Sequence, residues 1–231
     1  MRYSHGFLNF WVKYKILRRD TYKQQGLRKH LIDTLRNEGF RDEKVLEAMM
    51  RVPRHMFLEK AFEEWAYKNV AFPIGCEQTI SQPLTVAIQT SLLDVQKGNK
   101  ILEVGTGSGY QACILHELGA KVYTIERQSS LFEKTNRLLK DLGYGSIRTF
   151  LGDGYAGLPI FAPFDKILVT AGASDLPETL IHQLSISSHL VIPIGDENSQ
   201  TMWKYTLHEE GQIDSKAFGK FKFVPFLKGI Q

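Results

Sequence analysis

The sequence contains little cysteine and no clustered histidine. Two cysteines, Cys76 and Cys113, occur among 231 residues, and the seven histidines are scattered without a pair at metal-ligand spacing. A disulfide framework or a zinc site needs more thiols, or His and Cys residues at shorter spacing. We therefore expect two reduced thiols and no metal site.

Long apolar runs are also absent. No stretch approaches the roughly 20 apolar residues that a membrane-spanning helix requires. The apolar stretch at 7–12 is shorter than the core of a secretory signal peptide, and no small-residue cleavage site follows it. We therefore expect no membrane span and a cytoplasmic location.

The net charge of +4 is too small to favour a nucleic-acid partner by itself, so we expect none. The charge is unevenly distributed, because residues 1–30 carry a net charge of +7 and the rest of the chain about −3. We expect a basic, aromatic extension at 1–20 and a single domain at 21–231. Two interpretations of the extension stay open: a loosely docked segment, or a contact for a partner or a membrane surface.

Apolar runs alternate with helical patterns over the second half of the chain, which is typical of a doubly wound α/β sheet. Before them, helical patterns predict one helix from residue 22 to a stop at Gly39, a second that Asp42 caps and 52–53 ends, and two more at 55–67 and 84–93. An irregular loop is expected at 76–82. The last two expected strands have no helix between them and predict an antiparallel hairpin. We therefore expect a seven-stranded, mostly parallel Rossmann-like sheet with strands at 100–104, 121–126, 147–151, 164–169, 189–194, 201–207 and 218–224, and with helices at 110–118, 129–142 and 177–184.

Three alternating glycines, Gly105, Gly107 and Gly109, follow the first strand of this sheet. A strand that ends in a glycine-rich turn and continues into a helix directs backbone amides at a ligand. The second strand ends at Glu126, 21 residues after Gly105. A carboxylate at that position can accept hydrogen bonds from a ribose. These features predict a nucleoside-bearing cofactor.

The identity of the cofactor follows from glycine spacing and charge. The G-x-G-x-x-G spacing of dinucleotide-binding domains is not met. Glu103, at the end of the first strand, would repel a pyrophosphate but suits the cationic amino-acid end of S-adenosylmethionine. Asp153, after the third strand, is placed to accept from an adenine amino group. We therefore expect S-adenosylmethionine rather than NAD.

The methyl acceptor is less constrained by sequence. The fourth strand is followed by Thr170-Ala171-Gly172-Ala173, not by an Asn-Pro-Pro-Tyr tetrad, and neither cysteine follows a proline. Both observations disfavour a nucleic-acid base as acceptor. A carboxylate acceptor would need an anion site, and Ser81 lies just before a helix N-terminus with unpaired amides. The alternative, that Ser81 and Thr79 only cap this helix, stays open.

Several segments together resemble the protein-L-isoaspartate O-methyltransferase family, over roughly residues 22–228. The glycine turn alone indicates the wider class I methyltransferase group, whereas Thr79-Ile80-Ser81-Gln82-Pro83 is specific to the family. The segments are Arg51-Val52-Pro53-Arg54, Phe72-Pro73-Ile74-Gly75, Gln78-Thr79-Ile80-Ser81-Gln82-Pro83, Glu103-Val104-Gly105-Thr106-Gly107-Ser108-Gly109-Tyr110, Gly152-Asp153-Gly154, Ala162-Pro163-Phe164-Asp165, Gln183-Leu184, Ile192-Pro193-Ile194-Gly195 and Phe223-Val224-Pro225.

The resemblance implies a repair enzyme that methylates the free α-carboxylate of L-isoaspartyl residues in damaged proteins. Residues 21–97 would then hold the N-terminal helices and the active-site loop, and 98–231 the cofactor-binding sheet of a monomer. Ser81 would be the catalytic hydroxyl, and Gln82, Val224 and Pro225 would contact the substrate. The resemblance assigns cofactor binding to Thr79, Ile80, Glu103, Gly105, Thr106, Gly107, Ser108, Gly109, Glu126, Asp153 and Gly154.

Some positions depart from the family pattern. Glu77 stands where a second glycine is usual, so it would be strained if the backbone there needs a positive φ. Leu84 stands where an aromatic residue is frequent, and 184–188 replaces a Pro-Gly-Gly turn. Two other functions stay open: a class I methyltransferase for a small molecule or RNA, and a binder that keeps the cofactor without catalysis.

Overall fold

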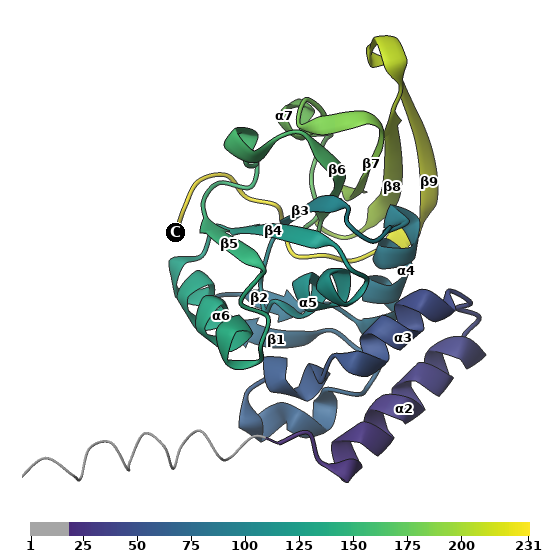
Figure 1. Cartoon of the computed structure of the whole chain (residues 1–231), viewed down its shortest axis with the longest axis vertical. Helices are drawn as coiled ribbons and strands as arrows, with labels where there is room; N and C mark the ends of the chain where they lie inside the picture. The colour runs from purple at the N-terminus through teal and green to yellow at the C-terminus, as the bar shows by residue number, and fades with distance from the viewer. Residues whose placement is uncertain (1–18) are drawn as a thin grey trace, which may run out of the picture.

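A computed structural model describes residues 19–231, so residues 1–18 of the expected N-terminal extension lie outside the described part of the chain. A single large sheet runs through the molecule, and most helices lie on one of its faces (Figure 1). The same view places the C-terminus near β5 (Arg148–Leu151) and α6 (Ser129–Asp141). After β9 at one edge of the sheet, the chain thus crosses back toward β5 at the opposite edge.

Seven strands form the main sheet in the order β5-β4-β3-β6-β7-β8-β9. The strands β5, β4, β3, β6 and β7 pair in parallel, whereas β7, β8 and β9 pair antiparallel. The expected doubly wound, mostly parallel sheet with a C-terminal hairpin is therefore confirmed. Its other strands are β3 (Lys100–Val104), β4 (Lys121–Glu126), β6 (Phe164–Val169), β7 (Leu184–Gly195), β8 (Gln200–Leu207) and β9 (Ile213–Phe221).

The central strands are buried on both faces and divide the core into two clusters. Successive side chains of a strand point to opposite faces. Ile101 accordingly packs into the cluster beneath the main helical layer, and Leu102 packs into the cluster on the other face. Leu168 and Ile167 of β6 divide in the same way. This double burial explains why these strands are rich in apolar residues on both faces.

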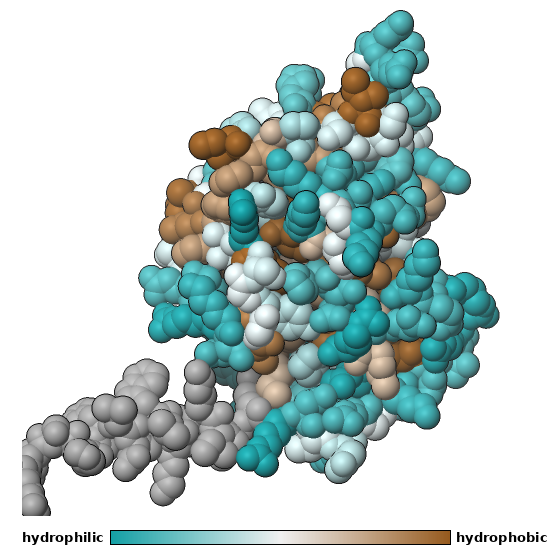
Figure 2. Space-filling model, in the orientation of Figure 1, coloured by the Kyte–Doolittle hydropathy of each residue, from teal (hydrophilic) through white to brown (hydrophobic). Residues whose placement is uncertain are grey.

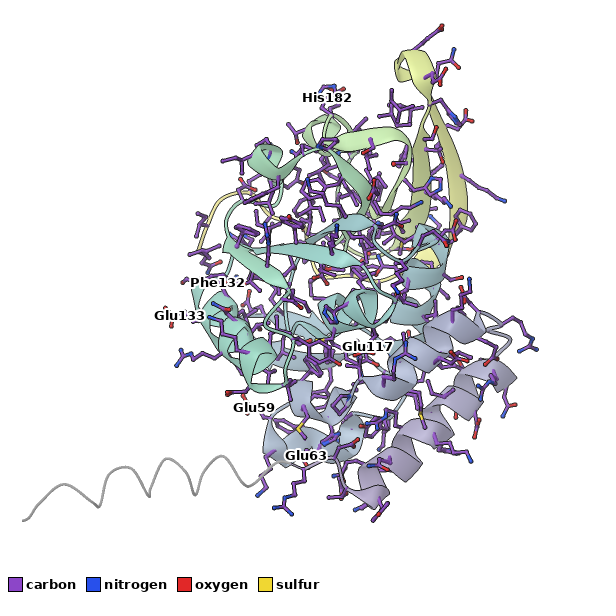
Figure 3. The ribbon with its side chains drawn as sticks, viewed as in Figure 1. Glu59, Glu63, Glu117, Phe132, Glu133 and His182 are labelled. Carbon is purple, nitrogen blue, oxygen red and sulfur yellow. The ribbon has the colours of Figure 1, made fainter. Side chains whose placement is uncertain are left out.

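The main helical layer consists of α2 (Tyr22–Asn37), α3 (Glu43–Arg51), α4 (Pro83–Leu93), α5 (Tyr110–Glu117) and α6, while the short α7 (Glu178–Ile181) packs on the opposite face. Asp42 caps α3 by accepting from the amide of Val45 at 3.3 Å, as expected from the sequence, and also accepts from the hydroxyl of Ser91 in α4. Arg51 pairs with Glu117 at 2.7 Å and ties α3 to α5. Figure 3 shows Glu117 of α5 beside α3. These contacts fix the N-terminal helices on the sheet.

Two N-terminal predictions were wrong in detail. The helix expected at 55–67 is two 3₁₀ turns, η1 (Arg54–Phe57) and η2 (Lys60–Trp65), because Leu58 and Glu59 between them are extended. The irregular loop expected at 76–82 is instead part of a hairpin of β1 (Phe72–Gly75) and β2 (Gln78–Ile80). The hairpin carries the chain directly to Ser81.

Several C-terminal boundaries also differ, including the start of β7 at Leu184 rather than at 189. The helix expected at 177–184 ends at Ile181, because Leu184 already pairs with Phe164 of β6. The last strand begins at Ile213 and ends at Phe221, since a short turn at Glu209–Gly211 lets β8 and β9 form a long ribbon. Val224 and Pro225 therefore follow the strand and belong to the chain that crosses the sheet edge.

The surface in the orientation of Figure 1 is mainly polar, with apolar side chains in separate patches (Figure 2). The most exposed large apolar side chains include Tyr22 and Ile160, which are 92% and 85% exposed. Within residues 19–231, no helix is long and apolar enough to cross a membrane.

The turn after β3 depends on glycine. Gly105, Gly107 and Gly109 have φ angles of 99°, 52° and 86°, a region that residues with a side chain rarely adopt. A Cβ atom on Gly109 would also lie 2.8 Å from Cγ2 of Thr135 in α6. The glycines therefore permit both the turn and the close approach of α6.

We expect Gly109→Ala to lower the free energy of unfolding by ~2–4 kcal/mol through backbone strain and the clash with Thr135. Gly26→Ala is the matched control, because Gly26 is exposed inside α2 with nothing within 4 Å of a new Cβ atom. That change should stabilise the protein by up to about 1 kcal/mol. Urea unfolding of both variants measures the difference, and equal stability would contradict the role of Gly109.

Candidate active site

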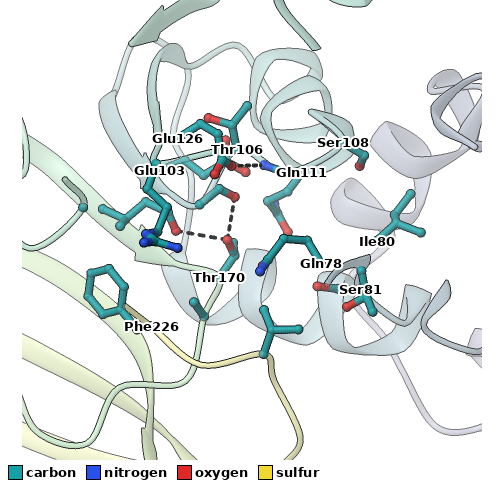
Figure 4. Close-up of a pocket in the computed structure, with 18 of the residues that line it drawn as sticks. Gln78, Ile80, Ser81, Glu103, Thr106, Ser108, Gln111, Glu126, Thr170 and Phe226 are labelled. Carbon is teal, nitrogen blue, oxygen red and sulfur yellow. Dashed lines mark hydrogen bonds between the residues drawn. The ribbon is translucent and has the colours of Figure 1, made fainter. Parts of the chain in front are cut away.

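A pocket opens at the carboxyl ends of β3, β4 and β6, where the glycine turn meets the β2–α4 connection (Figure 4). We call it the edge pocket. Carboxyl ends of parallel strands meet at one edge of a sheet, which is where ligands bind in open α/β folds. The pocket brings together the following residues predicted from the sequence: Thr79, Ile80, Ser81, Glu103, Gly105, Thr106, Gly107, Ser108, Glu126, Gly154, Val224 and Pro225.

Three other predicted residues lie elsewhere. Gly109 is the N-cap of α5 and packs toward α6. Gln82 lines a neighbouring hollow. The carboxylate of Asp153 does not line the edge pocket, because it accepts from the amides of Tyr155 and Gly229 at 2.9 and 2.8 Å. The adenine contact expected of Asp153 stays a prediction, and its neighbour Gly154 is the residue that reaches the pocket.

Glu103 is the buried acid of the edge pocket. The side chain is completely buried, and its Oε2 accepts from the hydroxyl of Thr124 at 2.5 Å. Its Oε1 has no hydrogen-bond partner among the described residues. The pKa of Glu103 is raised to about 8. Burial is the main cause and the charge of Glu126 adds to it, whereas the hydrogen bond from Thr124 lowers the pKa. An unpartnered carboxyl oxygen beside a pocket fits a ligand with a cationic donor.

Glu126 holds the glycine turn from the end of β4. Its Oε2 accepts from the amide of Gly107 at 2.8 Å, and its Oε1 accepts from the amide of Gln128 at 2.9 Å. The carboxylate is almost fully buried, yet it lines the edge pocket. Glu126 is therefore both a structural acceptor for the turn and a candidate acceptor for a ligand hydroxyl.

Ser81 lies between β2 and the first residue of α4. Among residues 19–231, neither the hydroxyl of Ser81 nor that of Thr79 makes a hydrogen bond, and the N-cap residue Gln82 makes no side-chain cap. The amide of Leu84 instead donates to Oδ1 of Asn69 at 3.0 Å. The alternative that Ser81 and Thr79 cap the helix is therefore wrong, and both hydroxyls are available to a ligand.

The hairpin turn before Ser81 places Glu77 at a positive φ, which is the backbone strain considered in the sequence analysis. Cys76 and Glu77 form a two-residue turn, with φ angles of 52° and 56°. Two-residue hairpins favour this left-handed geometry, and glycine adopts it at the lowest cost. Glu77 adopts it despite its side chain, so the loop keeps its shape at some energetic cost.

The chain after β9 closes one side of the edge pocket. The amide of Phe226 donates to the carbonyl of Gly172, and the amide of Gly172 donates to the carbonyl of Val224, both at 2.8 Å. The Phe226 ring stacks on Tyr155 with 4.0 Å between centroids. The guanidinium of Arg127 fastens the end of the segment by donating to the carbonyl of Gly229 at 3.0 Å. Pro225, Phe226 and Leu227 thereby become pocket walls.

Sequence reasoning missed several lining residues. Thr170 directly follows β6, and its position at the carboxyl end of a strand could have indicated a pocket residue. Its hydroxyl lies within 2.7 Å of the Gly105 carbonyl and 3.0 Å of the Val104 carbonyl, and it links β6 to the glycine turn (Figure 4). Phe226 carried no such signal, because its position depends on how the last residues cross the sheet. Gln78, Gln111 and Arg127 also line the pocket and were missed.

A second hollow, here called the outer hollow, adjoins the edge pocket. The two share Thr79, Ser81, Thr170 and Val224. Lys220 and Lys222 lie on the side of the outer hollow formed by the end of β9 and the residues after it. Ser81 thus stands at the junction of two concave surfaces, one beside the glycine turn and one beside an exposed strand edge.

Comparison with known proteins gives consistent results. The family model for protein-L-isoaspartate(D-aspartate) O-methyltransferase matches residues 26–231. The chain is 53% identical over 210 residues to the protein-L-isoaspartate O-methyltransferase of Flavobacterium psychrophilum, covering 91% of this chain and 98% of that one. The Cytophaga hutchinsonii protein of the same name is 52% identical over 208 residues, covering 90% and 94%.

Among solved structures, the chain is similar to a protein-L-isoaspartate O-methyltransferase (PCMT) from Plasmodium falciparum in complex with S-adenosyl-L-homocysteine. The TM-score is 0.77 at 25% sequence identity, covering 87% of this chain and 99% of that one. Another structure described as a protein-L-isoaspartate O-methyltransferase gives the same TM-score at 27% identity, covering 86% of this chain and 65% of that one.

Glu103→Gln tests the buried carboxyl group of the edge pocket. Because its pKa is raised from 4.5 to about 8, folded protein keeps a proton that the unfolded chain releases. This stabilisation is fully present below pH 4.5 and is lost as pH rises toward 8, by up to a few kcal/mol. The free energy of unfolding of the ligand-free protein should therefore fall more steeply with pH than that of Glu103→Gln. Equal pH slopes in urea unfolding would show that Glu103 is already ionised.

Proposed function

The chain belongs to the protein-L-isoaspartate(D-aspartate) O-methyltransferase family, and from this premise we propose that it transfers a methyl group from S-adenosylmethionine to the free α-carboxylate of L-isoaspartyl residues in damaged proteins. The resulting ester closes to a succinimide without the enzyme. Hydrolysis of the succinimide converts some of these residues to normal aspartate. The observation that carries the proposal is the position of Ser81, with a free hydroxyl, between the edge pocket and the outer hollow.

The edge pocket suits the cofactor in charge. S-adenosylmethionine supplies an electrophilic methyl group on a positively charged sulfur. The unpartnered Oε1 of Glu103 would accept from its ammonium, since the pocket offers a buried carboxyl group there. Glu126 would hold the ribose, and the glycine turn lets backbone approach the ligand closely. A phosphate-bearing cofactor fits less well, because the carboxylate of Glu126 would repel it.

Gly154 bears on the assignment of the adenine site, because a residue with a side chain would not fit there. A Cβ atom on Gly154 would lie 2.5 Å from Cγ1 of Val104 and 2.7 Å from Cε2 of Phe226. Glycine therefore lets Val104 of β3 and Phe226 of the C-terminal segment pack directly against the backbone at this edge of the pocket. We propose that Gly154 borders the adenine and that Asp153 acts indirectly, by holding the amide of Gly229.

The outer hollow suits a peptide acceptor. Phe221, Lys222 and Phe223 line it at the end of the edge strand β9 and just beyond it. The free edge of such a strand can pair with an extended peptide. We propose that the peptide lies along Val224 and Pro225, with Gln82 beside it, and that its isoaspartyl carboxylate reaches Ser81. A carboxylate is already a nucleophile at neutral pH, so the protein needs to align it and exclude water rather than remove a proton.

Three further features concern the location, the metal content and the assembly of the protein. Cys76 and Cys113 are free thiols, one exposed and one buried, which agrees with a cytoplasmic location. No group of three His, Cys, Asp or Glu side chains within 19–231 is arranged to hold a metal ion. The division into two parts at residues 97 and 98 and the monomeric state stay predictions.

The first experiment pairs an isoaspartyl peptide with its aspartyl twin. We expect the purified protein to transfer labelled methyl from S-adenosylmethionine to the isoaspartyl peptide and not to the twin, because only the isomer presents a free α-carboxylate within the chain. Scintillation counting of the two peptides gives the result. Equal labelling, or none on either peptide, would contradict the proposal.

Ser81→Ala tests the hydroxyl at the junction. Loss of a hydrogen bond to a charged acceptor should lower kcat/KM for the isoaspartyl peptide by ten- to a hundredfold. Cofactor affinity, measured by calorimetry, should change little. The control is Ser215→Ala, an exposed hydroxyl on β9 outside both hollows. If Ser81→Ala turns over as fast as Ser215→Ala, the hydroxyl has no part in the reaction.

A further inference from the structure

Arg54 is a completely buried cation directly behind the proposed active site. The residue opens η1 and is 1% exposed. Its Nε donates to the carbonyl of Ala66 at 2.9 Å, and its Nη2 donates to the carbonyl of Ser81 at 2.8 Å. Its Nη1 has no hydrogen-bond partner among the described residues. One side chain therefore joins η1 to the loop that carries Ser81.

The guanidinium has no carboxylate partner within residues 19–231. Burial lowers the pKa of Arg54, and the groups that oppose this shift are the neutral phenols of Tyr110 and Tyr67. Arginine nevertheless stays protonated in proteins. Arg28, the other well-buried arginine, differs because it pairs with Asp20 at 2.7 Å.

An unpaired buried charge is costly, and an apolar side chain of similar size would normally fill such a position at lower cost. The charge of Arg54 lies beside two parts of the edge pocket. It contacts the backbone of Ser81, and its guanidinium carbon is 4.7 Å from the centre of the Tyr110 ring. Both residues line that pocket. The uncompensated charge therefore acts on the site where the acceptor is expected.

We propose that Arg54 is a positioning residue that fixes the Ser81 backbone and supplies the positive charge by which the site selects a negatively charged acceptor. The proposal rests on the function proposed above and adds to it the origin of the preference for an anion. Ser81 alone cannot supply this preference, because a hydroxyl also hydrogen-bonds a neutral amide.

The chemistry of methyl transfer indicates which step Arg54 assists. A carboxylate oxygen forms a bond to the methyl carbon while the carbon–sulfur bond breaks and its electron pair stays on sulfur. The acceptor changes from an anion to a neutral ester, and no proton moves. A fixed positive charge therefore stabilises the bound substrate more than the ester. Arg54 should strengthen substrate binding and favour release of the product.

The test compares two peptides that differ only in charge at the acceptor position. One carries the isoaspartyl carboxylate, and the other carries a carboxamide in its place. Their Kd values are measured by calorimetry with the protein saturated with S-adenosylhomocysteine, so that no turnover occurs. Wild-type protein should bind the carboxylate peptide about tenfold or more tightly, as expected for one unit charge within several ångströms at the effective dielectric constant of a protein.

Three variants separate charge from packing. Arg54→Gln keeps a hydrogen-bond donor without the charge, Arg54→Met keeps only the apolar length, and Arg54→Lys keeps the charge. The two neutral variants should lose most of the carboxylate preference, while Arg54→Lys keeps at least half of it on a logarithmic scale. Arg51→Gln and Arg51→Met are the controls, because Arg51 is a nearby arginine that pairs with Glu117 on the surface. They should keep the full preference.

A purely structural role would change the melting temperature of the Arg54 variants and leave the ratio of the two Kd values within twofold of wild type, which would overturn the proposal. An equal loss in Arg54→Lys and Arg54→Gln would overturn the role of the charge. If neither neutral variant folds, the wild-type ratio decides, since a protein without preference for the carboxylate peptide has no use for the charge. A wild-type protein that methylates isoaspartyl peptides yet fails this test keeps its function and loses only this inference.

Discussion

The burial of a carboxyl group at the end of β3 is the constraint on which the edge pocket depends. Glu103 is enclosed beneath the glycine turn with one oxygen bonded to Thr124 and the other unpartnered. Glu126, at the end of the neighbouring strand, bonds the Gly107 amide and adds a second acid beside it. Parallel pairing of β3 with β4 places the two acids at the same edge. The pocket consequently favours a cation, and the glycine turn cannot move without breaking the bond to Glu126.

Opposite charges lie on the two sides of this site. The acids line the edge pocket, whereas the buried guanidinium of Arg54 lies behind Ser81 and the lysines Lys220 and Lys222 lie beside the outer hollow. A cationic methyl donor and an anionic acceptor would each meet the complementary charge. Because Ser81 and Thr79 belong to both surfaces, the donor and the acceptor would meet at the β2–α4 connection.

Most of the sheet and the cofactor side of the site could be predicted from sequence, because both depend on local patterns. The runs that became β3, β4 and β6 are largely buried on both faces, so each is rich in apolar residues and ends at a pocket residue or directly before one. The rest depends on contacts between distant segments. The wall at Phe226 forms through bonds to Gly172, and Asp153 is occupied by the amide of Gly229. The cap on α4 comes from Asn69, which no local helix signal could indicate.

With its raised pKa, Glu103 would have to give up a proton in order to accept the ammonium of S-adenosylmethionine. The most direct measurement is calorimetry of cofactor binding near pH 7 in buffers of different ionisation enthalpy, which counts the protons released. With the pKa of free Glu103 at about 8, we predict release of close to one proton by the wild-type protein and almost none by Glu103→Gln. Equal proton release by the two proteins would contradict this account.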